Sequence, residues 1–119
     1  MTIRDLVQEP LVIALAWTFV LAWKVYFTRG FDAIHACNPP DLFFLIAALF
    51  KPLGVRFLFD HHDLNPELYE GKFGGRGFVY RALVALERWT FRLADVSIAT
   101  NESYRTIALE RGGMPRDRV

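Results

Sequence analysis

After its first thirty residues, the chain alternates short apolar runs with longer segments of helical length. The short runs cover residues 31–37, 55–60 and 95–100, and each has the length and the apolar content of a buried strand. Residues 41–53 and 77–94 lie between them and are long enough to form helices. This order predicts right-handed crossovers between parallel strands. We therefore expect an α/β fold, in which a parallel sheet carries helices on both faces.

Helix start signals follow two of the predicted strands. Asn38 and Asp41 flank two prolines directly after the first strand, a sequence typical of a helix start. Asn101 and Glu102 follow the third strand and predict a last helix that runs toward Arg111. Ligands of an open parallel sheet bind beyond the carboxyl ends of its strands, where such helices begin. The candidate ligand-binding loops are therefore residues 36–41, 60–67 and 100–103.

Residues 11–28 are the most apolar segment of the chain and predict a helix without a polar face, because Thr18 and Lys24 are its polar positions before the end. Such a helix is buried, lies on a membrane surface or spans the membrane. Lys24 disfavours a spanning helix. Trp17 and Trp23 suit either a lipid interface or a protein core. We expect a very apolar helix that packs on protein or lies at the membrane periphery.

Composition limits the class of protein. A chain of 119 residues with 53% hydrophobic residues suits one domain with a packed core and is not disordered. The net charge of +1 provides no attraction to nucleic acid, so none is expected as a partner. The single cysteine, Cys37, excludes an intramolecular disulfide and a zinc site with several thiolates, and it favours a cytoplasmic location. The length leaves room for one lobe of a two-substrate enzyme.

The densest polar cluster, from Asp60 to Glu67, follows the second predicted strand. His61 and His62 are adjacent, so their side chains leave the strand in opposite directions and a shared metal ion is disfavoured. A histidine that acts as a general base or hydrogen-bonds a substrate fits this position, since imidazole changes charge near neutral pH. The alternative is a histidine that only ties its loop together through Asp60 or Asp63.

Two further patterns are weaker indications of a functional site. Residues 71–77 are rich in glycine and basic residues, but they match neither common phosphate-binding motif, so they predict a flexible connection. Arg81, Arg88 and Arg92 recur at helical spacing in the segment that follows. A solvated helix face explains this spacing better than a surface for phosphate or lipid head groups.

Three segments together resemble a known family: FDAIHACNPPDLFFLIA, FDHHDLNPELYEGKFG and ALERWTFRLADVSIATNESYRTIALERGG. They are similar to the amino-terminal domain of bacterial glycosyltransferases of family 4. Those are retaining enzymes of the GT-B type, with two Rossmann-like domains, that build exopolysaccharide, capsule and lipopolysaccharide. The resemblance covers about residues 17–119 and implies that the predicted sheet is part of a Rossmann-like GT-B amino-terminal domain.

In that family the amino-terminal domain mainly holds the acceptor and the carboxy-terminal domain holds the nucleotide-sugar donor. The resemblance implies that His62 is the catalytic candidate, faces the cleft and touches the transferred sugar or its phosphate. It also implies acceptor contacts for Asn38 and Asp41, and no metal ligand or bound cofactor. The remaining candidates for substrate binding, in the loop after the second strand and at the edge of the cleft, are His61, Asp63, Glu67, Asn101, Glu102 and Arg105.

The resemblance also sets expectations for the whole chain. Residues 1–119 lack the family's first strand, its glycine-rich loop and the donor domain, so we expect a partial acceptor-side domain that is inactive alone. The partners expected are a nucleotide-sugar donor, a glycan or lipid-linked acceptor, and a complementing donor-domain chain. The expected location is the cytoplasm, at the inner face of the cell membrane. The alternative is a non-catalytic module that binds a membrane or a partner protein, and a structural remnant without activity is a third reading.

Overall fold

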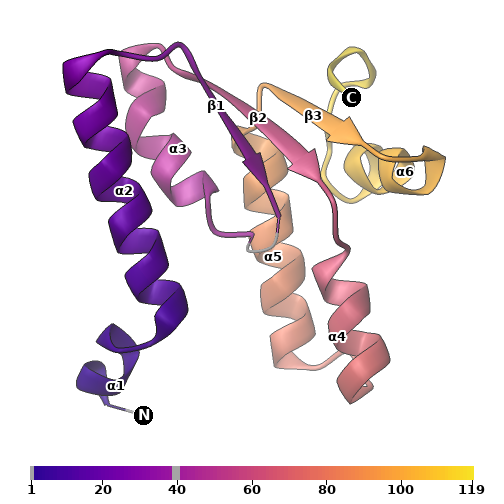
Figure 1. Ribbon diagram of the computed structural model, residues 1–119. Helices are drawn as coiled ribbons and strands as arrows, with labels where there is room; N and C mark the ends of the chain where they lie inside the picture. The colour runs from indigo at the N-terminus through magenta and orange to yellow at the C-terminus, as the bar shows by residue number, and fades with distance from the viewer. Residues whose placement is uncertain (1, 39–40) are drawn as a thin grey trace. The chain divides into compact units, whose positions relative to one another are not determined.

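The computed structural model describes residues 2–38 and 41–119, and the chain divides into two compact units, Met1–Asp32 and Ala33–Val119. Helices α1 and α2 belong to the first unit (Figure 1). The sheet and the other helices belong to the second unit, which carries the candidate site.

The first unit contains the apolar helix expected over residues 11–28. A short helix, α1 (Ile3–Val7), precedes the long helix α2 (Pro10–Thr28). Proline suits the first turn of α2 because the N–H that it lacks would have no partner there. The helix ends where Gly30 adopts φ 74° and donates its N–H to the carbonyl of Val25 at 3.1 Å. None of the residues in α2 is buried, and the helix is long and apolar enough to cross a membrane.

Three parallel strands form the sheet of the second unit: β1 (Ala33–Cys37), β2 (Arg56–His61) and β3 (Val96–Ala99). Their spatial order is β1-β2-β3, so β1 is an edge strand among the described strands. In the parallel register, Cys37 lies opposite Asp60. This arrangement confirms the predicted α/β fold with its parallel sheet.

Helices of this unit pack on one face of the sheet. Phe57 and Phe59 of β2 are fully buried in a cluster with Ala47, Phe91 and Ala108, which come from three different helices. The rings of Phe59 and Phe91 meet edge to face at 5.2 Å, a favourable geometry for aromatic side chains. The helices are α3 (Phe44–Phe50), α4 (Asn65–Phe73), α5 (Phe78–Leu93) and α6 (Glu102–Glu110), with short 3-10 turns at Lys51–Leu53 and Arg116–Arg118.

The other face of the sheet carries accessible side chains within this unit. Successive residues of a strand point to opposite faces, so His35, Cys37 and Asp60 share the face that turns away from the core. Val96 and Ile98 of β3 belong to the same face and are 40% and 41% exposed. The prediction was for helices on both faces, and within residues 33–119 helices α3, α5 and α6 pack on the face of the buried cluster. The polar set on the accessible face therefore lies open to solvent and to ligands in this unit.

The helix predicted over residues 41–53 begins later than its sequence signals indicated. Helix α3 starts at Phe44, its N-cap residue Phe43 makes no side-chain capping bond, and a 3-10 turn continues the segment to Leu53. Asn38 does not cap this helix, because its side chain is bonded to the loop after β2. The two prolines of the predicted start lie outside the described residues.

Helix α4 is a structural feature that the hydrophobic pattern did not predict. Its sequence has no apolar stripe, although a proline in its first turn suits a helix start. The flexible connection expected over residues 71–77 therefore begins inside this helix. Gly74 and Gly75 end it with φ 75° and 79°, conformations that favour glycine.

Candidate functional site

Asn38 fixes the loop that follows β2. Its Oδ1 accepts hydrogen bonds from the backbone N–H groups of His62 at 2.6 Å and Asp63 at 3.1 Å. Its Nδ2 donates to the carbonyl of Asp63 at 2.6 Å. The Asn38 side chain is only 4% exposed, so water cannot readily replace these bonds. Asn38 thus holds the loop that contains His62. Asn38 was predicted to line the acceptor side, and its direct contact with a ligand stays a prediction.

Asp60 joins two histidines on the accessible face of the sheet. Its Oδ1 lies 2.9 Å from Nε2 of His62, and its Oδ2 lies 3.1 Å from Nε2 of His35. Both imidazoles are about half exposed, at 50% and 52% of their side chains. Burial acts to raise the pKa of Asp60, but hydrogen bonds from His35 and His62 outweigh it and leave the pKa below its usual value. The carboxylate is therefore ionised at neutral pH.

This carboxylate sets the tautomer of His62. An ionised carboxylate only accepts hydrogen bonds, so Nε2 of His62 must carry the proton in the contact with Asp60. Nδ1 is then the ring atom that remains for a ligand, and it accepts a proton or hydrogen bond while the ring is neutral. In the neutral ring Nδ1 can accept a hydrogen bond from a hydroxyl group, and in the protonated ring it can donate one to a phosphate oxygen.

The start of helix α6 lies beside the same loop. Asn101 caps this helix, since its Oδ1 accepts the N–H of Tyr104 at 3.0 Å. The Tyr104 hydroxyl donates to the backbone carbonyl of His62 at 3.3 Å. Glu102 and Arg105, also predicted site residues, form a loose ion pair at 4.0 Å on this helix. The structure therefore brings the 101–105 segment to the His62 loop, and its predicted place at the edge of a cleft stays a prediction.

His61 lies on the opposite side of β2 from His62. Its side chain is 1% exposed, and it packs against the rings of Phe59, Phe91 and Tyr104 at 5.2–5.3 Å. Its closest charged group is Glu87, at 3.7 Å. A substrate contact was predicted for His61, whereas the structure places its ring inside the core of residues 33–119. Substrate binding by His61 stays an untested prediction, and we do not include His61 in the proposed site.

The Asn38 loop, the Asp60–His62 pair and the start of α6 thus meet at the carboxyl edge of the parallel sheet. Open α/β sheets bind their ligands at this edge.

The family model for glycosyltransferase family 4 matches residues 3–119 of this chain. The chain belongs to glycosyltransferase family 4. No solved structure shows a significant match to it. Family 4 membership makes the chain a glycosyltransferase module, with a nucleotide-sugar donor and an acceptor as its general substrates, and confirms the partial Rossmann-like GT-B fold.

Arg111, which directly follows α6, joins this helix to α4 and α5 through two carboxylates. It donates from Nε and from a terminal nitrogen to Glu87 of α5, at 2.6 and 3.0 Å. Its terminal nitrogens also bond both carboxylate oxygens of Glu67 of α4. Glu87 is fully buried, so its charge depends on Arg111 for compensation. Glu67, predicted to bind substrate in the loop after β2, anchors α4 to Arg111 at the end of α6, and its contact with a substrate stays a prediction.

The same cluster shifts the ionisation of its members. Burial acts to raise the pKa of Glu67, but hydrogen bonds from Arg111 outweigh it and hold the pKa below its usual range. Burial acts to lower the pKa of Arg111, but its bonds to Glu67 and Glu87 raise it further above its ordinary value. Glu67 and Arg111 are therefore both charged at neutral pH. Sequence reasoning missed this cluster, because Arg111 is 24 residues from one partner and 44 from the other.

Asp41 is the one predicted acceptor residue whose charge is poorly compensated. It is 4% exposed, and neither carboxylate oxygen has a hydrogen-bond partner among the described residues. Burial raises the pKa of Asp41 above its ordinary value, although the nearby side-chain amides of Asn65 and Asn38 act to lower it. The folded protein consequently favours a neutral Asp41 more than the unfolded chain does.

Asp41→Asn is expected to stabilise the chain at neutral pH by about 1 kcal/mol, because it removes a buried charge that lacks bonded partners. A raised folded pKa means that wild-type Asp41 is best tolerated below its unfolded pKa, and that stability falls as the pH rises through the folded pKa. The gain from Asp41→Asn should therefore shrink toward acidic pH. Urea denaturation of both proteins over a pH series measures it. A gain that grows on acidification would contradict the assignment.

Proposed function

We propose that residues 33–119 form the acceptor side of a nucleotide-sugar-dependent glycosyltransferase in the synthesis of bacterial cell-surface polysaccharide. Family 4 membership supports glycosyl transfer itself. The resemblance of the HHDLNPELYE and ATNESYR segments to enzymes of exopolysaccharide and lipopolysaccharide synthesis supports the finer proposal. We further propose that transfer by this acceptor side requires a donor-binding lobe, as in the two-domain enzymes that the sequence resembles. No bound cofactor or metal is needed for this role.

The observation that carries the proposal is the way in which His62 is held. Asn38 fixes the backbone of His62 and Asp63, and Asp60, two residues earlier in the chain, orients the imidazole. Transfer from a nucleotide sugar develops positive charge at the sugar carbon and negative charge on the departing diphosphate. Polar groups fixed in advance stabilise such charges better than mobile ones, because they need no reorganisation during the reaction. His62 with Asp60 behind it is such a group.

Backbone amide shifts in a nuclear magnetic resonance titration test the acceptor-side assignment. We expect a polyprenyl diphosphate-linked hexose in detergent micelles to shift the amides of His62 and Asp63, and those at the start of α6. A nucleotide sugar such as UDP-glucose should cause no comparable shifts, since the proposal assigns the donor to the other lobe. Empty micelles control for detergent, and α5 amides beside Arg88 serve as the internal reference. Saturable shifts with the nucleotide sugar, together with no shifts from the lipid-linked hexose, would contradict the acceptor-side assignment.

A second candidate function, membrane attachment, rests on helix α2. The helix has a mean hydropathy of 1.7, none of its residues is buried, and Trp17 and Leu21 are 63% and 55% exposed. Tryptophan is enriched where helices meet the membrane–water interface, and exposed apolar side chains gain free energy when they leave water for lipid. We propose that α2 attaches the chain to the inner face of the cell membrane, where lipid-linked acceptors would be found. The same helix would serve the alternative, a non-catalytic membrane-associated module.

Vesicle co-sedimentation measures the attachment. The full chain is expected to sediment with phosphatidylcholine vesicles, and Trp17→Lys with Leu21→Lys should reduce the bound fraction at least about tenfold, because each lysine replaces a large apolar side chain at the interface. Gln8→Lys with Thr28→Lys adds the same charge at exposed polar positions and should bind like the wild type. Equal loss in both double variants would mean that charge, and not insertion of α2, governs binding. Wild-type protein that stays in the supernatant would contradict the attachment.

A further inference from the structure

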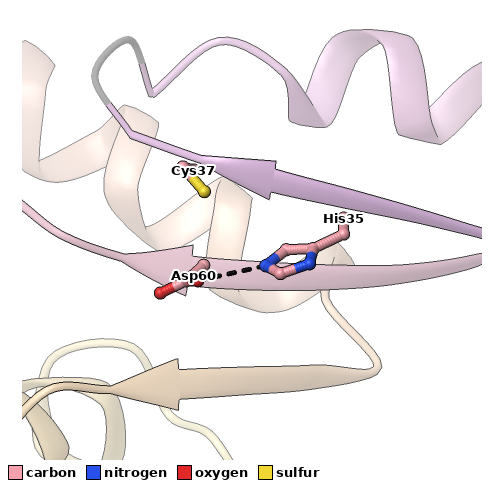
Figure 2. Close-up of side chains that lie close together, drawn as sticks. All are labelled: His35, Cys37 and Asp60. Atoms are coloured by element: carbon pink, nitrogen blue, oxygen red, sulfur yellow. Dashed lines mark hydrogen bonds and ion pairs between the residues drawn. The ribbon is translucent and has the colours of Figure 1, made fainter.

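We propose that His35, Cys37 and Asp60 form a binding site for a divalent cation of the zinc class on the accessible face of the sheet (Figure 2). The site differs from the adjacent His61 and His62 pair, for which the sequence disfavours a shared metal ion. It uses a histidine and a cysteine that the proposed transfer reaction does not need. The metal site shares Asp60 with the proposed transfer site, but the inference does not rest on the proposed function.

The parallel strands bring the three side chains together. His35 and Cys37 are two residues apart on β1, so both point to the same face of the sheet. Asp60 of β2 lies opposite Cys37 in the register, and its side chain points to that face as well. One ligand atom from each residue, the imidazole nitrogen, the thiol sulfur and a carboxylate oxygen, lies within 4.8 Å of the other two. Figure 2 shows the imidazole of His35 reaching across to Asp60, with the sulfur of Cys37 beside them.

The distances suit a small tetrahedral ion after a modest movement of the thiol. Nε2 of His35 and Oδ2 of Asp60 are 3.1 Å apart. Zinc bonds of about 2.0–2.2 Å to nitrogen and oxygen put two tetrahedral ligands at close to this separation. Cys37 is exposed, so its side chain has room to turn toward the ion, and water can fill the fourth position. The side chains of His35 and Cys37 are both exposed, so an ion can reach them from solvent.

The ligand types select the class of ion. A thiolate, an imidazole and a carboxylate together favour zinc, cobalt or nickel over magnesium and calcium, which prefer oxygen ligands alone. On binding, the thiol of Cys37 gives up its proton to solvent, and His35 binds through the lone pair of Nε2 with its ring proton on Nδ1. The ion takes Oδ2 of Asp60, while His62 is bonded to Oδ1. Metal binding is therefore compatible with the His62 contact.

A titration of the full chain with cobalt and with zinc tests the site, in the presence of a phosphine reductant that keeps Cys37 reduced. We expect one cobalt ion per chain, with thiolate-to-cobalt charge-transfer absorption that zinc abolishes by displacing the cobalt. Cys37→Ser and His35→Gln should each weaken zinc binding, measured by calorimetry, at least about tenfold. His62→Gln is the matched control, because it alters the other histidine on Asp60, and it should leave the affinity within about threefold of the wild type.

Each outcome decides the proposal. Charge-transfer absorption that Cys37→Ser removes, together with weaker zinc binding in His35→Gln, supports the three-residue site. Cobalt binding without a thiolate band, or a Cys37→Ser variant that binds zinc as tightly as the wild type, overturns it. A loss in His62→Gln as large as that in His35→Gln overturns the assignment of the ligands. Circular dichroism of each variant separates lost binding from lost folding, and a variant that does not fold leaves the decision to the wild-type cobalt spectrum.

Discussion

Arg111→Met is expected to lower the free energy of unfolding by about 3–5 kcal/mol, because it leaves Glu87 as an uncompensated charge in the core. Methionine keeps much of the length of the side chain and removes only its charge and its hydrogen bonds. Glu67 would lose its partner as well, which frees α4 from the end of α6. Urea denaturation followed by circular dichroism at neutral pH measures the loss.

Two comparisons show whether the buried pair causes this loss. Arg88→Met removes an exposed arginine from α5 and should change the stability by less than about 0.5 kcal/mol. Adding Glu87→Gln to Arg111→Met should restore part of the stability, since the unpaired charge is gone. The contribution of Glu67 is present above its unfolded pKa and is lost as the pH falls through its lowered folded pKa. A loss from Arg111→Met no larger than that from Arg88→Met would contradict the role of the cluster.

His62→Asn is expected to lower the rate of sugar transfer by about 10²–10⁴-fold, the range for loss of a positioned proton-transfer or hydrogen-bonding group. The variant should fold normally, because the backbone N–H of His62, and not its ring, donates the hydrogen bond to Asn38. The assay is transfer of labelled hexose from a nucleotide sugar to lipid-linked acceptors, with the chain supplied together with a donor lobe of family 4.

The matched control for His62→Asn is His35→Asn, which removes the other imidazole on Asp60. His35 lies inside strand β1, whereas His62 lies in the loop beyond the end of β2, at the ligand edge of the sheet. His35→Asn should therefore cost far less activity. Equal losses in the two variants would show that the reaction depends on the charge of Asp60 and not on the His62 ring. Full activity in His62→Asn would contradict its catalytic role.

The hydrophobic pattern predicted the sheet well because strand burial is largely local information. Apolar runs of strand length marked all three strands, and the observed strands lie within a residue or two of the expected ends. The period of two also predicted correctly that His61 and His62 point in opposite directions. It could not tell which of the two faces the core, and the ring contacts of His61 with Phe59 and Phe91 decide that.

Features that depend on tertiary contacts could not be read from the sequence. Asn38 has the signature of a helix cap, but its side chain bonds Asp63 of a loop 25 residues away. Helix α4 lacks an apolar stripe and is anchored by Glu67 to Arg111, which follows α6. The approach of His35 and Cys37 to Asp60 depends on the register between β1 and β2. A local pattern contains none of these pairings.

Sugar transfer by the reconstituted pair of lobes tests the central claim most directly. The claim is that the carboxyl edge of this sheet, with His62 held by Asn38 and Asp60, is the acceptor side of a family 4 glycosyltransferase. We predict that labelled hexose reaches lipid-linked acceptors only when this chain and a donor lobe are both present, and that His62→Asn abolishes most of the transfer. Transfer by this chain alone, or by the pair with His62→Asn at the wild-type rate, would contradict the claim.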